Sequence, residues 1–330
     1  MKLGINGFGR IGRQVFRIAF PDEKLEVVHV NDLTDARTLA HLLQFDTTYG
    51  PWSRQVSSED RTLVVGSHRI TVTSEPDPGR IPWRDRGVDV VLESTGRFRT
   101  RATAGKHLEA GARKVLVTAP GKGPLDGDFV LGVNDELYDR ARHDIISIGS
   151  CTTNCLAPVA KVLHAELGIE HGFMTTVHAY TASQNLQDGP HKDLRRARAS
   201  CENIIPTSTG AAKAIGSVLP ELAGKLDGLA MRVPVICGSI VDLTCRVGKA
   251  TTAAEVNAAM RRWAEDRMKG ILYVQDAPIV SRDVVGSPFS AIVSPQDTAV
   301  LGDRLVKVLA WYDNEWGFSQ RCVDMMARMV

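Results

Sequence analysis

The sequence predicts an α/β protein in which a doubly wound parallel sheet is followed by a second, α+β domain with a mixed or antiparallel sheet. A chain of 330 residues is long for a single hydrophobic core, which favours two domains. In the first half, short apolar runs typical of buried strands alternate with helical patterns, which is the order of a parallel sheet. The second half contains longer strand patterns, such as residues 173–180 and 235–247.

The composition, with 43% hydrophobic and 24% charged residues, is typical of a globular enzyme. The net charge of +2 argues neither for nor against a nucleic-acid or membrane partner. No charged tail or block suggests an electrostatic docking arm, and no nucleic-acid partner is expected. We find no signal peptide and no apolar run long enough to span a bilayer, and six scattered cysteines indicate reduced thiols. We therefore expect a cytoplasmic protein without a membrane partner. Cys151 and Cys155 lack a second Cys/His pair nearby, so no metal site is predicted.

A glycine motif follows the first predicted strand, residues 2–6, and precedes a helical pattern. It has the form G-x-G-x-x-G and consists of Gly7, Gly9 and Gly12 with Arg10 and Ile11 between them. The first glycine permits a tight turn, the second lets the backbone approach a pyrophosphate, and the third lets helix and strand pack closely. The N–H groups of Arg10 and Ile11 would point at phosphate oxygens. This context predicts a Rossmann-type dinucleotide site.

Asp32 strengthens this prediction because it ends the second predicted strand, twenty positions after Gly12. A carboxylate there accepts hydrogen bonds from the adenosine ribose and repels a 2′-phosphate, which favours NAD over NADP. The alternative is that Asp32 only caps a helix after Thr34. Further strands are predicted at 61–65 and 69–72, as a hairpin, and at 88–93 and 114–117. Their ends and that of the second strand supply further candidates for cofactor contacts: Asn31, Ser94, Thr95 and Thr118.

Cys151 lies where a predicted buried strand, residues 144–148, turns into a helix whose apolar face begins at Leu156. Ser150 is one of several possible caps for this helix. A thiol at a helix N-terminus feels the positive end of the dipole, which favours the nucleophilic thiolate. The alternative is that Cys151 is a small buried hydrophobe.

His178 is the candidate partner of Cys151. Alternation along the next strand, residues 173–180, puts Thr176 and His178 on one face. A nucleophilic cysteine and its histidine come together in the fold rather than in the sequence. An imidazolium would stabilise the thiolate, and the same ring could then move protons.

Two anion sites are predicted in the second half. A hydroxyl-rich turn at residues 203–210 precedes a predicted helix, 211–219, which is a suitable anion site. Arg232 stands between apolar neighbours and needs an anionic partner, either a carboxylate or a phosphate. The long polar segment 181–201 carries a basic run that is either a solvated charged face or a functional loop. Further helices are predicted at 253–266 and 320–329, and a strand at 305–311.

Along essentially its whole length, the sequence resembles phosphorylating, NAD-dependent glyceraldehyde-3-phosphate dehydrogenases. Five stretches carry the resemblance, namely Ile5–Arg13, Ser150–Cys155, His191–Arg198, Ser208–Lys213 and Trp311–Gly317. The resemblance implies an NAD domain at 1–150, with the C-terminal helix 315–330 packing back on it, and a catalytic domain at 151–314. It also implies a homotetramer in which the loop at about 181–201 is the family's S-loop at a subunit interface.

The resemblance assigns roles to single residues. Cys151 is the nucleophile, His178 is its base, Asp32 selects NAD, and Asn314 holds the nicotinamide carboxamide. The positions that fall among the family's substrate and phosphate contacts are Ser150, Thr152, Thr181, Arg195, Thr209, Gly210 and Arg232. Three positions depart from the family pattern: Ile148-Gly149 replace Asn-Ala before Ser150-Cys151, Ser183 replaces a common Asp, and Pro76 stands where a Lys or Arg often lies near the adenine.

The implied reaction converts D-glyceraldehyde 3-phosphate, NAD and inorganic phosphate to 1,3-bisphosphoglycerate through a thiohemiacetal and a thioester on Cys151. Three alternatives remain at this point. The chain could be an erythrose-4-phosphate dehydrogenase, a relative that uses arsenate, or a binding protein that kept the fold and lost catalysis. The presence of both Cys151 and His178 argues against the last.

Overall fold

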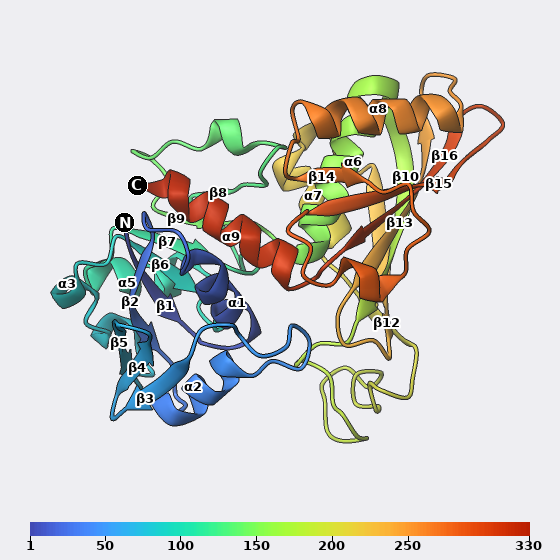
Figure 1. Cartoon of the computed structure of the whole chain (residues 1–330). Helices are drawn as coiled ribbons and strands as arrows, with labels where there is room; N and C mark the ends of the chain where they lie inside the picture. Colours follow the sequence, from blue (N-terminus) through green and yellow to red (C-terminus); the bar gives the residue numbers. More distant parts are fainter. The chain divides into compact units, whose positions relative to one another are not determined.

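The computed structural model describes all 330 residues and divides the chain into two compact units (Figure 1). Unit 1 consists of Met1–Phe129, Leu137–Gly149 and Ser319–Val330, and unit 2 of Val130–Glu136 and Ser150–Phe318. Each unit is built on its own sheet. Most of the C-terminal helix α9 (Trp316–Met329) belongs to unit 1, together with the first part of the chain.

The sheet of unit 1 has nine strands in the order β3-β4-β5-β2-β1-β6-β7-β9-β8. Its strands are β1 (Lys2–Asn6), β2 (Glu26–Asn31), β3 (Val56–Glu59), β4 (Thr62–Val65), β5 (His68–Thr73), β6 (Val90–Glu93), β7 (Lys114–Val117), β8 (Gly127–Asp128) and β9 (Ile145–Ser147). All neighbours from β5 to β8 pair in parallel, and β3, β4 and β5 pair antiparallel. The strands that follow β1 first extend the sheet on one side of it, beginning with β2, and then on its other side, beginning with β6. The strand order therefore reverses between β1 and β6. Such a switch point is where open α/β sheets bind ligands.

The helices of unit 1 are α1 (Arg10–Ala19), α2 (Ala36–Gln44), α3 (Trp83–Arg86), α4 (Arg101–Ala104) and α5 (Lys106–Glu109), with most of α9. The helical pattern of residues 102–110 predicts a single helix that ends at Gly111, but the structure interrupts this helix at Gly105, between α4 and α5. Glycine is a poor helix former, which explains a break at this position. The helix stops at Gly111 as expected, where φ is +107°.

The sheet of unit 2 has seven strands in the order β11-β12-β10-β13-β16-β15-β14. They are β10 (Ile169–Ala179), β11 (Ile205–Ser208), β12 (Leu226–Val233), β13 (Ser239–Val247), β14 (Leu272–Val274), β15 (Ala291–Leu301) and β16 (Leu305–Tyr312). The pairs β10/β12 and β14/β15 are parallel and the others antiparallel. This mixed sheet confirms the predicted class of the second half.

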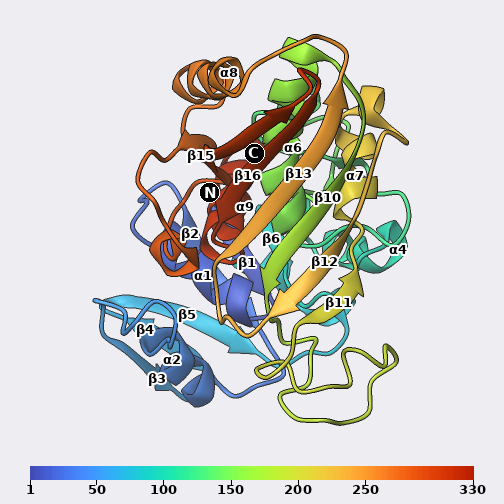
Figure 2. The same cartoon turned by 90° about the vertical axis from the view of Figure 1, so that its right-hand side faces the viewer.

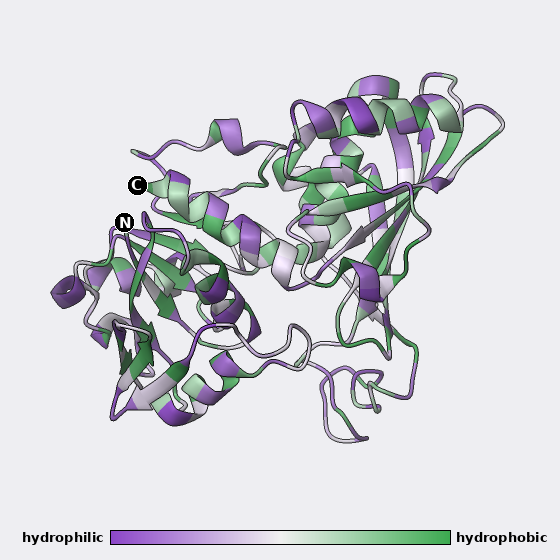
Figure 3. Ribbon diagram, viewed as in Figure 1, coloured by the Kyte–Doolittle hydropathy of each residue, from purple (hydrophilic) through white to green (hydrophobic).

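Three helices pack on this sheet: α6 (Cys151–Leu167), α7 (Ala211–Val218) and α8 (Ala253–Glu265) (Figure 2). The predicted apolar face of α6 is buried, with Leu156 and Val159 inaccessible to solvent in one continuous core. Figure 3 shows the same pattern in both units, where the strands are mainly hydrophobic and the helices carry hydrophilic faces. Four 3₁₀ segments complete the elements: η1 (Pro78–Arg80), η2 (Asp135–Leu137), η3 (Pro220–Leu222) and η4 (Ser281–Val284). None of the helices is both long and apolar enough to cross a bilayer.

Candidate active site

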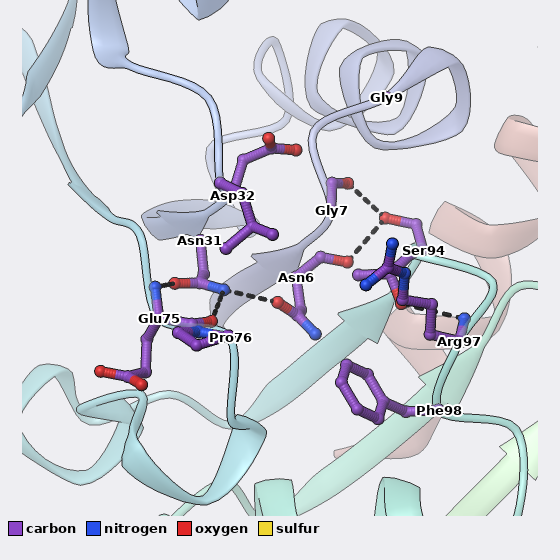
Figure 4. A pocket seen from close by; sticks show the side chains of 12 residues that line it. Asn6, Gly7, Gly9, Asn31, Asp32, Glu75, Pro76, Ser94, Arg97 and Phe98 are labelled. Carbon is purple, nitrogen blue, oxygen red and sulfur yellow. Dashed lines mark hydrogen bonds between the residues drawn. The ribbon is translucent and has the colours of Figure 1, made fainter.

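A pocket of about 290 Å³ lies in unit 1 at the carboxyl ends of β1, β2 and β6 (Figure 4). Its lining residues are Asn6, Gly7, Gly9, Asn31, Asp32, Leu33, Glu75, Pro76, Ser94, Thr95, Arg97 and Phe98. The structure thus brings together most of the residues predicted to contact the cofactor. Thr118 is not in the lining and donates to the Glu93 carbonyl oxygen at 3.2 Å. Asn6, Glu75, Arg97 and Phe98 were missed, because no spacing rule marks residues only for lying at or beside a strand end.

The glycine motif behaves as predicted at each position. Gly7 has a φ of +92°, and a Cβ on it would lie 2.7 Å from the Thr95 nitrogen. A Cβ on Gly12 would collide with the Gly7 carbonyl oxygen, so only glycine lets α1 pack this close to the loop. A Cβ on Gly9 would meet no atom within 4 Å. Gly9 therefore faces open space that a ligand can occupy.

Asp32 ties the second strand to the glycine loop. Its Oδ2 accepts a hydrogen bond from the Phe8 nitrogen at 2.7 Å, and its Oδ1 accepts one from the Thr34 nitrogen at 2.9 Å. The side chain that caps α2 is Asp35, which accepts from the Thr38 nitrogen. The alternative interpretation of Asp32 as a helix cap is therefore wrong.

These features fit a dinucleotide. No side chain caps the N-terminus of α1 at Gly9, so the positive end of its dipole faces the open space beside that glycine. The Arg10 side chain forms an ion pair with Asp46 at 2.5 Å. Asp32 provides acceptor oxygens in the same pocket.

Cys151 is the first residue of α6, as predicted. Ser150 is the N-cap, and its Oγ accepts a hydrogen bond from the Thr153 nitrogen at 3.1 Å. The Cys151 Sγ lies 3.4 Å from the Nε2 of His178, which comes from β10. Thr176 and His178 are both buried on one face of that strand. The structure therefore brings the predicted thiol and imidazole into direct contact.

The pKa values of Cys151 and His178 do not favour the predicted thiolate–imidazolium pair. Burial raises the pKa of the Cys151 thiol, although its residue keeps some solvent exposure, and the nearby Arg232 partly opposes this rise. Burial and Arg232 lower the pKa of His178 to about 3. The expectation of a lowered thiol pKa beside an imidazolium is thus wrong for this state of the protein. The neutral forms prevail because both groups are desolvated, and the positive charge beside the thiol belongs to Arg232.

Arg232 also limits the protonation states of His178. The Nδ1 of His178 lies 2.6 Å from the Ala179 carbonyl oxygen and 2.6 Å from Nη1 of Arg232, which itself donates to that oxygen at 3.0 Å. A guanidinium can only donate, and a carbonyl can only accept. The ring therefore bonds Ala179 as the Nδ1–H tautomer or Arg232 as the Nε2–H tautomer. The first leaves the Nε2 lone pair facing the thiol.

Arg232 has no carboxylate partner. Its Nε is buried without a hydrogen bond, and its Nη1 contacts His178 and the Ala179 carbonyl oxygen but no carboxylate. Of the two partners expected from the sequence, a protein carboxylate is therefore excluded. An unsatisfied buried donor is costly, which favours an anionic ligand at this point.

Tyr312 is a residue of this cluster that the sequence did not reveal. Its hydroxyl lies 2.8 Å from Thr152 Oγ1 and 2.9 Å from Thr176 Oγ1, and its ring edge faces His178 with centroids 5.9 Å apart. Tyr312 directly follows the predicted strand 305–311, and buried tyrosines generally bond their hydroxyl. That rule could have marked it as a polar contact but not named its partners.

The remaining predicted phosphate contacts lie outside this cluster. Thr181 Oγ1 bonds Ser183 Oγ at 3.0 Å, Thr209 Oγ1 accepts from the Ala211 nitrogen at 3.2 Å, and the Arg195 side chain is exposed. Gly210 precedes α7, and no side chain caps that helix. None of these four residues is hydrogen-bonded to Cys151 or His178.

The amide of Asn314 is held in one orientation. Its Oδ1 accepts hydrogen bonds from the Gly238 nitrogen at 3.1 Å and the Ser239 hydroxyl at 3.0 Å. The NH₂ group is therefore the part left to donate to a ligand. Among the departures from the family pattern, Gly149 has a φ of +72° and Ile148 is fully buried, so this pair turns the chain between β9 and α6 without polar side chains.

Comparison with known proteins agrees with this geometry. Residues 1–101 match the family model "Glyceraldehyde 3-phosphate dehydrogenase, NAD binding domain", and residues 150–314 match the C-terminal domain model of the same family. The chain is 55% identical over 327 residues to a glyceraldehyde-3-phosphate dehydrogenase of Geobacillus stearothermophilus, with 99% of this chain and 97% of that protein covered. Similar enzymes from Bacillus subtilis (54%; 99% and 97% covered) and Streptomyces arenae (55%; 98% and 97% covered) carry the same name. The chain belongs to the glyceraldehyde-3-phosphate dehydrogenase family.

Proposed function

We propose that this chain catalyses the NAD-dependent oxidative phosphorylation of D-glyceraldehyde 3-phosphate to 1,3-bisphosphoglycerate, a step of glycolysis and gluconeogenesis. The observation that carries the proposal is the 3.4 Å contact between Cys151 Sγ and His178 Nε2 in a member of this family. The erythrose-4-phosphate and arsenate alternatives are not favoured, since the relatives at 54–55% identity are named glyceraldehyde-3-phosphate dehydrogenases.

Cys151 is the nucleophile. Thiol and imidazole rest in their neutral forms, so the S–H proton passes to His178 Nε2 as sulfur attacks the aldehyde carbon. The oxygen of the resulting hemithioacetal is stabilised by the Cys151 N–H at the start of α6 and by the imidazolium. Covalent capture splits a difficult oxidation and acylation into two easier steps.

His178 is the base. The imidazolium formed in the attack first returns its Nε2 proton to the hemithioacetal oxygen, which leaves the neutral Nδ1–H tautomer bonded to Ala179. Nε2 then takes the hydroxyl proton back as the hydride leaves the substrate carbon. When bound, NAD supplies the acceptor for the hydride that leaves the substrate carbon. The product on Cys151 is a thioester, which keeps the energy needed to form an acyl phosphate.

Arg232 and the hydroxyls form the phosphate sites. The unsatisfied Arg232 Nε, with Thr181 and Arg195, binds the substrate phosphate, and the cap of α6 with Thr209 and Gly210 binds inorganic phosphate. Ser150 and Thr152 supply the hydroxyls at that cap. Attack of phosphate oxygen on the acyl carbon releases the Cys151 thiolate and 1,3-bisphosphoglycerate.

The proposed NAD contacts combine residues that line the pocket with others predicted from the sequence. Gly7, Gly9 and Gly12 with the N–H groups of Arg10 and Ile11 bind the pyrophosphate. Asp32 accepts from the ribose, and Pro76, Ser94, Thr95 and Thr118 complete the surroundings of the cofactor. Asn314 donates its NH₂ group to the nicotinamide carboxamide. Residues 1–150 with the helix 315–330 then form the NAD domain and residues 151–314 the catalytic domain.

A cytoplasmic homotetramer is the proposed state of the protein. Three large apolar side chains in or next to the loop 181–201 are exposed in the single chain, namely Leu186, Leu194 and Ile204. Exposed apolar side chains gathered in one segment are typical of an interface. Analytical ultracentrifugation tests this proposal, because a monomer at micromolar concentration would contradict it.

Substitution of the nucleophile tests the proposed function. Cys151→Ser should abolish acyl-phosphate formation and leave NAD affinity, measured by calorimetry, nearly unchanged. Cys201→Ser is the matched control, because Cys201 is an exposed free thiol and its loss should leave the activity intact. Substantial phosphorylating activity in Cys151→Ser would contradict the assignment.

A further inference from the structure

Glu93, the last residue of β6, is a buried carboxylate beneath the NAD pocket, with only 1% of its surface exposed. Its Oε1 accepts hydrogen bonds from the Thr95 nitrogen at 2.9 Å and the Thr95 hydroxyl at 2.5 Å. Its Oε2 is bonded by the Asn6 amide at 2.6 Å and by His107 Nε2 at 3.0 Å. Both oxygens thus accept two hydrogen bonds each, which is the full acceptor capacity of an ionised carboxylate.

His107 does not neutralise this charge. The Trp83 indole N–H donates to His107 Nδ1 at 3.0 Å, and an indole nitrogen can only donate. The Nδ1 atom therefore carries a lone pair, and Nε2 carries the proton that bonds Glu93. His107 is a neutral ring in a fixed tautomer, so Glu93 is held by hydrogen bonds alone. A buried charge without a counter-ion is tolerated only when its hydrogen bonds are complete.

The hydrogen bonds continue from Glu93 across the sheet. Asn6 on β1 accepts from the Asn31 amide of β2 at 2.8 Å, and Asn31 in turn accepts from the Thr73 hydroxyl of β5 at 2.8 Å and the Glu75 nitrogen at 2.9 Å. The four strands β6, β1, β2 and β5 are neighbours in the sheet. In Figure 4, Asn6 lies between Asn31 and Ser94. Glu93 thus anchors a row of side chains that supports the pocket.

The same carboxylate holds the turn after β6 against the glycine loop. Ser94 Oγ lies 2.6 Å from the Gly7 carbonyl oxygen, and the Thr95 nitrogen comes so close that Gly7 has no room for a Cβ. Both hydrogen bonds from Thr95 end on Glu93. Any loss of acceptor capacity at Glu93 therefore acts on the turn and on Asn6, which line the pocket, although Glu93 itself does not.

We propose that Glu93 is a positioning residue of the NAD site, whose ionised carboxylate orders Thr95 and Asn6 and thereby sets the affinity for NAD. The proposal rests on the proposed function only in taking NAD as the ligand of this pocket. Glu93 belongs to unit 1, whereas the thiol chemistry is carried by residues of unit 2. Its effect should therefore fall on binding of NAD and not on the chemical step.

Glu93→Gln tests the proposal because the amide keeps the shape but replaces one acceptor oxygen by a donor. One pair of donors then loses its acceptor, which costs about 1–3 kcal/mol, or roughly 5- to 150-fold in affinity. We expect the Kd for NAD, measured by calorimetry, and the KM for NAD to rise together in this range. The kcat at saturating NAD and the KM for the aldehyde should stay within about twofold.

Asp126→Asn is the matched control for loss of stability. The Asp126 carboxylate accepts from the Asp144 and Ile145 nitrogens at 2.9 Å in the same unit but does not line the pocket. This variant should lower Tm and leave the Kd for NAD unchanged. If Glu93→Gln does not fold, His107→Leu and His107→Gln replace it, because only the glutamine can still donate to Glu93.

A folded Glu93→Gln protein with the wild-type Kd for NAD would overturn the proposal. Equal effects of Glu93→Gln and Asp126→Asn on the Kd would overturn it too, because the role would then be purely structural. The same holds if His107→Leu binds NAD as tightly as His107→Gln. Measurements on the wild-type protein separate failure of this proposal from failure of the proposed function. If the proposed function is wrong, the wild-type protein will not bind NAD or will not oxidise the aldehyde.

Discussion

At the scale of single residues, the thiol and the imidazole are both held in their neutral forms, and Arg232 is the charge that acts on each of them. It lowers the pKa of Cys151 against the effect of burial, and it adds to burial in lowering the pKa of His178. The pair therefore becomes ionic only as the thiol attacks, which fits a nucleophile that must stay inert until substrate arrives.

Arg232→Gln should weaken both functions of this arginine. The kcat/KM for the aldehyde should fall about 30-fold or more, since removing one partner of a buried charged contact costs about 2–5 kcal/mol. The pH profile of alkylation of Cys151 by iodoacetamide should move to higher pH, because the charge that lowers the thiol pKa is lost. Arg198→Gln is the control, because the exposed Arg198 is paired with Asp188 and has no part in the proposed site. An unshifted alkylation profile in Arg232→Gln would contradict this role.

At the scale of elements, the N-terminus of α6 combines stability with chemistry. Ser150→Ala removes the side chain that bonds the Thr153 nitrogen, which should cost about 1 kcal/mol in the free energy of unfolding. It should also slow alkylation of Cys151, the next residue. Thr252→Ala, which removes the cap of α8, should cost a similar free energy and leave alkylation unchanged. Equal alkylation rates in the two variants would show that the cap has no part in thiol reactivity.

The loop between β1 and α1 allows a second test at this scale. Gly9→Ala places a methyl group in open space, so Tm should stay within a few degrees of wild type, while the Kd for NAD should rise at least about tenfold because the pyrophosphate loses its close approach to the backbone. In Gly12→Ala the new Cβ would clash with the Gly7 carbonyl oxygen, so this variant should have a lower Tm than wild type. Calorimetry and thermal unfolding distinguish the two. Wild-type NAD affinity in Gly9→Ala would mean that the cofactor does not pass over this loop.

At the scale of the whole molecule, two buried histidines make stability depend on pH. Burial lowers the pKa of His29 to about 4 and that of His178 to about 3, against an ordinary value of 6.5. The unfolded chain therefore binds protons below pH 6.5 that the folded chain does not bind, and the free energy of unfolding falls as pH falls from 6.5 to about 4. Each histidine contributes roughly 1 kcal/mol per pH unit in this range.

The measurement is the free energy of unfolding by urea between pH 7.5 and 4.5. His29→Gln, which keeps a donor for Thr73, should give a shallower fall with acid than wild type. His68→Gln is the control, since His68 is exposed. If His29→Gln falls as steeply as wild type, His29 does not carry this dependence.

Much of the fold could be predicted because local patterns and tertiary structure agree. The strand–turn–helix context of the glycine motif, the start of a helix at Cys151 and the alternation around His178 were predicted from local patterns and are present in the structure. Which of several residues caps the helix at Cys151 was left open, and the structure shows that it is Ser150. The interruption at Gly105 and the short strands β3, β8, β11 and β14 were missed, since they carry too few residues for a periodic pattern. The longer strands β12 and β15 were missed as well.

The site was predictable in its residues but less so in its electrostatics. The sequence showed that Cys151 and His178 could meet, but the desolvation that keeps them neutral depends on the packing of distant segments around them. Tyr312 and Glu93 were missed for the same reason: their partners, Thr152 and Thr176 for one and Asn6 and His107 for the other, lie far away in the sequence.

The most direct test of the central claim is stopped-flow absorbance of NADH after mixing the protein with NAD and glyceraldehyde 3-phosphate in phosphate-free buffer. A covalent thioester on Cys151 predicts a burst of about one NADH per chain, followed by slow turnover until phosphate is added. Turnover that shows no burst and does not respond to phosphate would contradict the acyl-enzyme mechanism and the two phosphate sites.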